Sequence, residues 1–368
     1  MIQRPVTTVV VKVGSSSLTA ANGALSSPAL DSIVRQLVDL SKGGVGVLLV
    51  TSGAIAAGRA AIGTAGRGRG VDVLQSLAAV GQGILMEEYA RRFREHETLV
   101  AQVLLTGRDF GERKAYLNAR STFTRLLRWR VVPIVNENDT VATDEITFGE
   151  NDRLAALVAT LLGADLLLIL TDTPGVFSAD PHLNAEASLV DEVTSFDASL
   201  EAATRSGPGS DMGSGGMASK IAAARIAAWS GIPCVIAGAA TPGVIGRVVG
   251  GEPLGTRVLP KPTRMPARKV WIAFAQAAKG RVSVDDGAVQ AICRRGHSLL
   301  PVGVRAVVGD FEAGEAVEIC DASGVLIAKG LSSCSADRLR TLSERSPGDE
   351  RWTTGAAVHR DDLVVLTT

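Results

Sequence analysis

Carboxylates and amides gather in two short clusters of the segment 131–172, at residues 136–139 (NEND) and 149–152 (GEND). The first cluster follows the apolar run 131–135, and the second opens a helix-like segment that leads to the apolar run 166–170. This order predicts a βαβ unit, and ligands of open α/β sheets bind beyond the carboxyl ends of the strands. Asn and Asp also favour ordinary turns. Two such clusters around one unit instead favour a site for a small polar ligand, with a metal nearby.

Two lysines stand beside glycine-rich segments where phosphate could bind. Lys12 lies in the β-branched run 7–13, before Gly14 and three serines, without the GxxxxGK[ST] pattern of a P-loop. Lys220 ends the segment 206–220 (SGPGSDMGSGGMASK), which leads into a predicted helix. Backbone amides of such loops and an ammonium group together bind phosphate oxygens. For Lys12, the alternative explanation is a lysine that snorkels from a strand edge. For the segment 206–220 it is a flexible linker, but a linker would not be expected to lead directly into a helix.

The sequence offers no Ser-His-Asp or Cys-His arrangement. The four histidines, His96, His182, His297 and His359, stand away from the predicted strand ends, so a histidine-centred mechanism is not expected. Phosphoryl transfer depends on positioning and charge neutralisation more than on covalent chemistry. Lysines and backbone amides suit that reaction, with carboxylates that hold Mg²⁺ or orient the lysines.

The elements that must position these residues alternate between strand and helix from residue 7 to about residue 250. The alternation predicts an open, mostly parallel sheet with helices on both faces. At the end of one strand, residues 51–54 (TSGA) form another small polar turn, which close packing of a helix start would also explain. The predicted strands are 7–13, 45–50, 100–105, 131–135, 166–170 and 233–237. One predicted helix begins at Ser27, and three others cover 74–96, 113–129 and 221–230.

A proline- and glycine-rich segment, residues 250–266, marks a domain boundary. Many short strands and few helices beyond it predict a small β-barrel-like module. The predicted strands are 269–275, 280–284, 304–308, 316–320, 326–328 and 363–367, with a helix at 286–294.

Length and composition predict a cytosolic protein of two domains. The 368 residues include 38 Lys plus Arg and 38 Asp plus Glu, and this balance argues against a dedicated nucleic-acid or membrane-surface protein. No signal-peptide pattern opens the chain, and no apolar run reaches the ~20 residues of a membrane span. The four cysteines form no CxxC pair and are expected to be reduced thiols: Cys234, Cys293, Cys320 and Cys334.

Six ordered motifs resemble those of the bacterial glutamate 5-kinases, which belong to the amino-acid kinase superfamily. They read VVVKVGSSSLT, LLVTSGAIAAG, VPIVNENDTVAT, FGENDRLAALVA, LLILTDTPGVFSADP and SGGMASKIAAA. The stretches VDDGAVQAI, GHSLLPVGVRAVVGDFEAGEAVEI and LIAKGLSSCSADRL are similar to the PUA domain often appended to them. The resemblance covers nearly the whole chain. It implies an amino-acid kinase fold at residues 1–258, a linker at 259–267 and a β-rich PUA-like domain at 268–368.

The resemblance also implies an activity. The enzyme would use ATP and Mg²⁺ to phosphorylate the γ-carboxylate of L-glutamate to L-glutamyl 5-phosphate, the first step of proline biosynthesis. Members of the family are commonly inhibited by proline, and the loop 63–70 (GTAGRGRG) could take part in that inhibition. A homo-oligomer is expected, and the downstream glutamyl phosphate reductase is a candidate partner.

Matching the family's motifs to this sequence assigns residues to three roles. Two lysines would lie at the ATP phosphates, with an aspartate that orients both of them. A hydroxyl, a carboxylate and an amide would bind glutamate, while a strand end and a glycine-rich loop would hold the nucleotide. The catalytic set is Lys12, Lys220 and Asp152; the substrate set is Ser52, Asp139 and Asn151; the nucleotide set is Lys12, Thr171, Asp172, Ser214, Gly215, Gly216, Met217, Ala218, Ser219 and Lys220.

The chain departs from the family at two positions and leaves two other functions to weigh. Glu150 stands where Asp is common, and Ser214 replaces a commoner Thr. Another amino-acid or carbamate kinase would share the fold and differ in its substrate. An RNA-binding or regulatory protein with a vestigial kinase domain would depend on the PUA-like domain. The nearly balanced charge beyond Thr263 argues against RNA as a partner, because phosphate contacts dominate such affinity.

Overall fold

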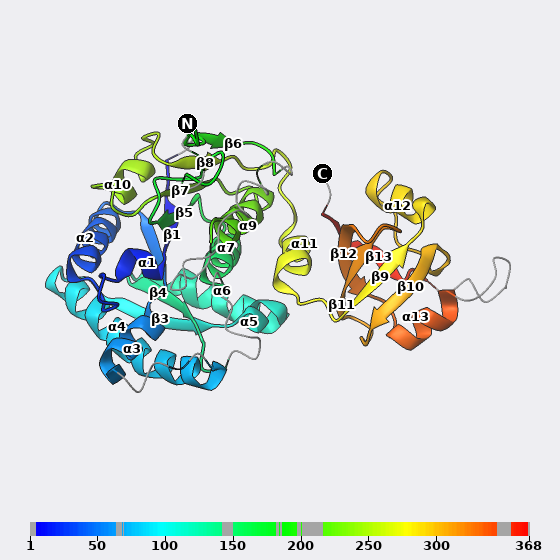
Figure 1. Cartoon of the computed structure of the whole chain (residues 1–368), viewed down its shortest axis with the longest axis horizontal. Coiled ribbons are helices and arrows are strands. Elements are labelled where there is room, and N and C mark those ends of the chain that lie inside the picture. Colours follow the sequence, from blue (N-terminus) through cyan, green and yellow to red (C-terminus); the bar gives the residue numbers. More distant parts are fainter. Residues whose placement is uncertain are drawn as a thin grey trace. The chain divides into compact units, whose positions relative to one another are not determined.

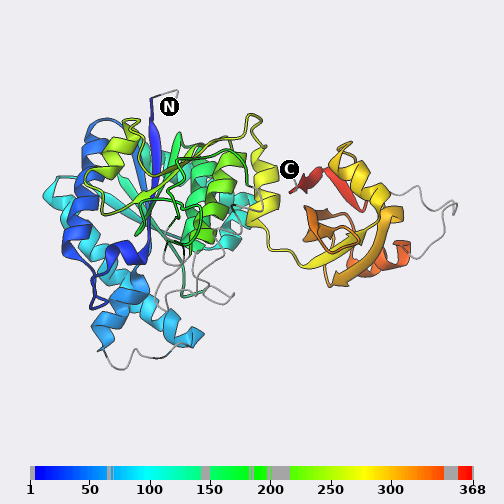
Figure 2. The ribbon, with the colours of Figure 1, turned by 45° about the horizontal axis from the view of Figure 1, so that its top comes forward.

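The computed structural model describes residues 5–63, 68, 70–141, 150–181, 184, 186–196, 200, 216–343 and 355–366. The chain forms two compact units, residues 1–264 and residues 265–368, and both are drawn in Figures 1 and 2. The exact limits proposed from the family resemblance, 258 and 268, stay a prediction.

A mostly parallel sheet forms the centre of the first unit. In the described part of the chain it has eight strands, in the order β3-β4-β2-β1-β5-β7-β8-β6. Only β7 and β8 run antiparallel among these paired strands. The α/β fold predicted from the alternating elements is therefore confirmed. The strands are β1 (Thr8–Val13), β2 (Gly46–Thr51), β3 (Val100–Leu105), β4 (Val132–Glu137), β5 (Leu166–Thr171), β6 (Glu192–Val193), β7 (Cys234–Gly238) and β8 (Thr256–Val258).

Helices cover both faces of this sheet (Figure 1). One face packs against α2, α4 and α10, and the other against α6, α7 and α9. Among the described residues, no helix is both long enough and apolar enough to cross a membrane. The helices are α1 (Ser15–Leu18), α2 (Ser27–Lys42), α3 (Ala54–Ile62), α4 (Val71–Glu95), α5 (Gly107–Gly111), α6 (Arg113–Arg128), α7 (Glu150–Leu162), α9 (Met217–Trp229) and α10 (Val244–Val249).

The alternation of side chains along β1 decides which face Lys12 meets. Val9, Val11 and Val13 belong to the core cluster that includes the buried side chains of α2, α4 and α10. Successive residues of a strand point to opposite faces. Lys12 therefore lies on the face that α7 and α9 cover.

The strand order reverses at β1. The chain pairs β2 on one side of β1 and β5 on the other, with β4 and β3 continuing beyond β2 and β7 beyond β5. A crevice forms beyond the carboxyl ends of the strands at such a switch point, and ligands of α/β sheets bind there. Lys12, Ser52 and Thr171 lie at this edge of the sheet, at or just after the ends of β1, β2 and β5.

The second unit is built on a sheet of five strands in its described part, in the order β10-β9-β11-β12-β13. Its core cluster includes Val282, Phe311 and Ile319. The predicted β-rich module is therefore confirmed. Its elements are α11 (Ala267–Val270), the π-helix η2 (Trp271–Ala275), β9 (Gly280–Val284), α12 (Asp286–Cys293), the 3₁₀ helix η3 (Pro301–Gly303), β10 (Val304–Gly309), β11 (Ala316–Cys320), β12 (Leu326–Ser332), α13 (Ala336–Ser343) and β13 (Val358–Val365).

The prediction of a strand at residues 269–275 is wrong, because this segment is helical in α11 and η2. A short apolar run does not distinguish a buried strand from a buried helix by its periodicity. Here a side chain from a strand, Lys329 of β12, stabilises the helical form. The Lys329 ammonium donates to the carbonyl oxygens of Ala273, at 3.3 Å, and Gln276, at the end of this helical segment.

Candidate active site

The Asp152 carboxylate is the centre of a buried charged cluster. It lies in the first turn of α7 and has no exposed surface. Its Oδ1 lies 2.6 Å from Lys12 Nζ, and its Oδ2 lies 3.5 Å from Lys220 Nζ. The Ser219 hydroxyl donates to Oδ2 at 2.7 Å. Three elements far apart in the sequence, β1, α7 and α9, thus meet at one carboxylate.

The packing of α7 against α9 sets this geometry. Both helices begin at the carboxyl edge of the sheet, and the hydroxyls of Thr160 and Ser230 form a buried hydrogen bond of 2.8 Å between their far ends. Small side chains let two helices approach closely, and both segments are rich in buried alanine. These alanines are Ala155, Ala156 and Ala159 in α7, and Ala223, Ala224, Ala227 and Ala228 in α9.

Burial and charge act in opposite directions on this cluster. Burial lowers the pKa of Lys12 below its ordinary value, and the nearby Lys220 ammonium adds to that effect, while Asp152 partly opposes it. Burial by itself raises the pKa of Asp152, but the two lysines outweigh it and hold the pKa below its ordinary value. Asp152 is therefore a carboxylate at neutral pH. With both lysines protonated the cluster carries one net positive charge, which suits an anionic ligand.

Asn151, the residue before Asp152, joins a different and uncharged cluster. Its Nδ2 donates to Ser52 Oγ at 3.1 Å and to Asn136 Oδ1 at 3.0 Å. Its Oδ1 accepts from the backbone amide of Glu137 at 3.2 Å. We call Ser52, Asn136, Asn151 and Gln82 the amide cluster. It joins the ends of β2 and β4 to the start of α7.

Two members of the amide cluster were not assigned from the sequence. Asn136 is 2% exposed, and its Nδ2 donates to Gln82 Oε1 at 2.8 Å. A signal for Asn136 existed, because it opens the polar segment that follows a predicted strand. Gln82 lies inside the long helix α4, and no local pattern distinguishes it from its neighbours.

The described residues of the nucleotide set lie at the same edge of the sheet. Thr171 ends β5 and is buried, and its hydroxyl donates to Asp172 Oδ1 at 2.9 Å. Gly216 precedes α9, and the helix opens with residues 217–220. Ser214 and Gly215 lie outside the described residues, as does most of the loop 63–70.

Asp139, assigned to the substrate, lies half-buried just beyond the end of β4. Asn136 lies in β4 and accepts a hydrogen bond from Asn151, which also donates to Ser52. Asp139, three residues further along the chain, therefore lies at the same edge of the sheet as the rest of the substrate set.

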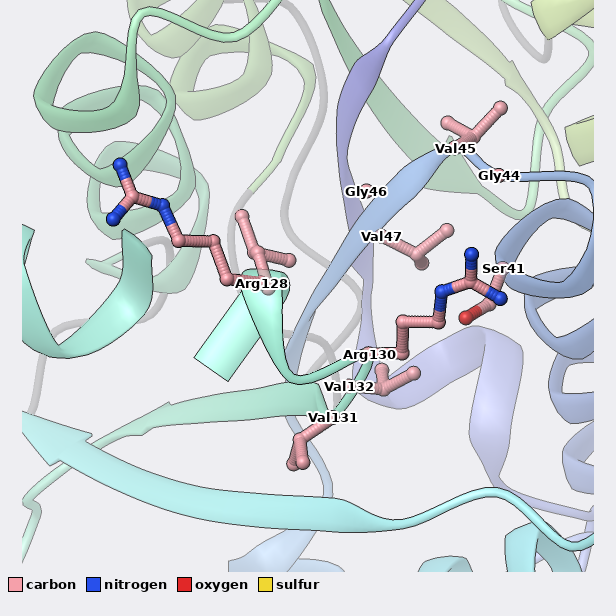
Figure 3. Close-up of a pocket in the computed structure, with 10 residues that line it drawn as sticks. Ser41, Gly44, Val45, Gly46, Val47, Arg128, Arg130, Val131 and Val132 are labelled. Atoms are coloured by element: carbon pink, nitrogen blue, oxygen red, sulfur yellow. The ribbon is translucent and has the colours of Figure 1, made fainter. Parts of the chain in front are cut away.

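A separate pocket of about 140 Å³ lies at the other end of the strands (Figure 3). It is lined by Gly46 and Val132, the first residues of β2 and β4, and by the side chains of Ser41, Arg128 and Arg130. Arg130 has a φ of 58° and follows the end of α6, where its amide donates to Leu127 O at 3.0 Å. That is the usual geometry of a helix C-terminus, so the pocket is explained by how α6 ends.

A match to a family of known proteins assigns the chain to a class of enzymes. A model of the amino acid kinase family matches residues 7–238, and a model of the PUA domain matches residues 280–346. Among solved structures, the UMP kinase from Bacillus anthracis is similar at 18% identity with a TM-score of 0.49, over 70% of this chain and 98% of that one. By the family match, this chain is an amino acid kinase, and amino acid kinases are phosphotransferases.

Closer relatives define the branch. The glutamate 5-kinase of Moorella thermoacetica is 47% identical over 363 residues, which are 97% of this chain and 96% of that protein. The glutamate 5-kinase of Chromobacterium violaceum is 46% identical over 97% of both chains. The chain therefore belongs to the glutamate 5-kinase family, and the resemblance predicted from its motifs is confirmed.

Proposed function

We propose that this protein transfers the γ-phosphoryl group of ATP to the γ-carboxylate of L-glutamate, the first step toward proline. The observation that carries the proposal is the Asp152 carboxylate held between Lys12 and Lys220. A phosphoryl group in transfer spreads negative charge over its oxygens, and two fixed ammonium groups stabilise that charge. The printed names of the relatives supply the acceptor, glutamate.

The two clusters divide the work in this proposal. Lys12 and Lys220 contact the phosphates of ATP, and Asp152 holds both lysines in place. The γ-carboxylate oxygen of glutamate attacks the γ-phosphorus in line, so an O–P bond forms to the carboxylate as the bond to the β-phosphate oxygen of ADP breaks. Thr171, Asp172 and the segment 214–220 bind the rest of the nucleotide.

Glutamate itself would be held by Ser52, Asp139 and Asn151. The Asp139 carboxylate and the Asn151 carbonyl suit the substrate's ammonium group, which would distinguish an amino acid from a plain carboxylic acid. Asn151 and Asp152 are neighbours in the sequence, so a glutamate on the amide cluster and a phosphate on the lysines would lie side by side.

Mg²⁺ enters the proposal with the nucleotide. Within the described ranges, no three His, Cys, Asp or Glu side chains converge as a metal site, so those residues do not fit a metal held by the protein alone. Mg²⁺ binds phosphate oxygens readily and keeps several waters. We therefore assign it to the ATP phosphates and derive no step that needs a protein ligand for it.

An assay that traps acyl phosphates with hydroxylamine tests the proposal. The full chain, ATP and Mg²⁺ should give hydroxamate with L-glutamate, and much less with L-aspartate, N-acetyl-L-glutamate or carbamate. Equal or faster turnover of carbamate or aspartate would assign the chain to another kinase of the same fold. Absence of any ATP-dependent product would remove the proposal.

The same assay tests regulation and partners. We propose that proline inhibits by competing with glutamate, so added proline should raise the apparent KM for glutamate and leave kcat unchanged. The proposed setting is the cytoplasm, as a homo-oligomer. A glutamyl phosphate reductase would consume the unstable acyl phosphate there. The free cysteines, Cys234, Cys293, Cys320 and Cys334, support a reducing compartment.

A further inference from the structure

Gln82 reaches the amide cluster from α4, a helix that contains no residue assigned to the substrate. Its Oε1 accepts a hydrogen bond from Asn136 Nδ2 at 2.8 Å. Its own Nε2 is enclosed and has no hydrogen-bond partner among the described residues. The polar role that the structure gives this side chain is therefore that of an acceptor for Asn136.

That bond is one of three that set which way the Asn136 amide faces, and it holds the donating end. Asn136 Oδ1 accepts from the Glu137 backbone amide at 2.9 Å and from Asn151 Nδ2 at 3.0 Å. An asparagine has a donating end and an accepting end, so a partner for the donating end fixes the direction of the other. Without the acceptor on Gln82, the donating end of Asn136 loses that partner, and the amide is held through its oxygen by the Glu137 amide and Asn151. A less firmly held Asn136 would orient Asn151 toward Ser52 less firmly.

The position of α4 relative to the substrate pocket is itself fixed. Gly81 lies so close to α3 that a Cβ there would stand 1.7 Å from Ala54 O. Eight residues further along α4, the Tyr89 hydroxyl forms a buried hydrogen bond of 2.9 Å with Thr51 Oγ1 at the end of β2. Ser52 lies between Thr51 and Ala54, so α4 is held on both sides of the residue that Asn151 contacts.

We propose that Gln82 is a positioning residue for the substrate: it holds Asn136 in the orientation that directs Asn151 toward Ser52 and the bound glutamate. This rests on the proposed function, because it concerns the same glutamate site. The charged cluster around Asp152 is built from other residues, so Gln82 acts on glutamate binding and not on ATP.

The test is a KM and kcat comparison in the full chain. Gln82→Met keeps the length of the side chain and removes the acceptor. It should raise KM for glutamate about fivefold, the effect of one lost hydrogen bond of about 1 kcal/mol, and leave kcat and the KM for ATP within about twofold. Gln82→Asn keeps an amide but is one methylene too short to reach Asn136, and it should match the methionine variant. If Gln82→Met fails to fold, Gln82→Asn tests the same prediction.

A matched control and a double variant separate positioning from stability. Gln36 accepts a hydrogen bond from the Ile245 amide at 2.9 Å, away from the site, so Gln36→Met should leave every KM unchanged. In an Asn136→Ala background, Gln82→Met should add no further rise in KM, because its effect passes through Asn136. An unchanged KM in both Gln82 variants, or additive effects in the double variant, would overturn the inference. If wild-type protein makes no glutamyl phosphate, the proposed function fails instead.

Discussion

Asn151 and Asp152 are consecutive residues of α7, yet they belong to clusters with opposite physical character. Asp152 is completely buried and bound to two lysine ammonium groups. Asn151 is half-buried and exchanges neutral hydrogen bonds with Ser52 and Asn136. In the proposed function, a step of one residue along α7 thus separates the phosphate side of the site from the glutamate side.

This difference in charge and burial determines which kinetic constant each cluster is expected to control. Burying ions is costly unless each is paired, so a buried lysine–aspartate–lysine cluster indicates a use for charge that packing alone does not explain. Neutral hydrogen bonds contribute about 1 kcal/mol each and are directional. We expect the charged cluster to govern kcat and the amide cluster to govern the KM for glutamate.

Removing a lysine should have the largest effect. Lys220→Met deletes one of the two ammonium groups but leaves Asp152 paired with Lys12 at 2.6 Å, so the fold should persist. Losing one preorganised group that stabilises transition-state charge lowers kcat by about 10²- to 10³-fold. Steady-state kinetics with saturating glutamate and ATP measure the loss, and a thermal melt checks the fold.

Lys42→Met is the matched control, because Lys42 lies exposed at the end of α2 and should not affect turnover. A Lys220→Met enzyme with near-normal kcat and a raised KM for glutamate would reverse the assignment of the two clusters. It would also remove the phosphate role of Lys220.

The pH dependence of kcat should show the charged cluster directly. The pKa of Lys12 in the folded protein is lowered by burial and by Lys220, so Lys12 loses its proton at a pH below its ordinary 10.5. As pH rises through that lowered pKa, kcat should fall by up to about tenfold per unit, because only the protonated lysine stabilises the phosphoryl group. A profile of kcat between pH 7 and about pH 10 measures this alkaline limb.

The pH profile of the Lys220→Met variant tests whether Lys12 causes the alkaline fall in kcat. Without the Lys220 ammonium the pKa of Lys12 should rise, and the limb of the residual activity should move to higher pH. A limb that stays in place would mean that another group titrates, and that Lys12 does not control the alkaline side.

All three residues of the charged cluster were assigned from the sequence, but only Ser52 and Asn151 of the four residues of the amide cluster were. Lys12 and Asp152 lie at or next to strand and helix ends, where alternation of strand and helix already places ligands. Each apolar run that predicted a strand corresponds to a strand in the structure, apart from residues 269–275. The bond between Gln82 and Asn136 joins positions that no local pattern connects, since it depends on how α4 packs against α3 and the sheet.

Ser52→Ala should have the smallest effect and probes the amide cluster alone. It removes the hydroxyl that accepts from Asn151 Nδ2 at 3.1 Å, at a cost of about 1 kcal/mol, or about fivefold in the KM for glutamate. kcat should stay within about twofold because the lysines are untouched. Ser76→Ala, on the exposed surface of α4 where Ser76 Oγ donates to Asp72 O, is the control. If Ser52→Ala instead lowered kcat severely at an unchanged KM, Ser52 would act on the phosphoryl group, and the division between the two clusters would be wrong.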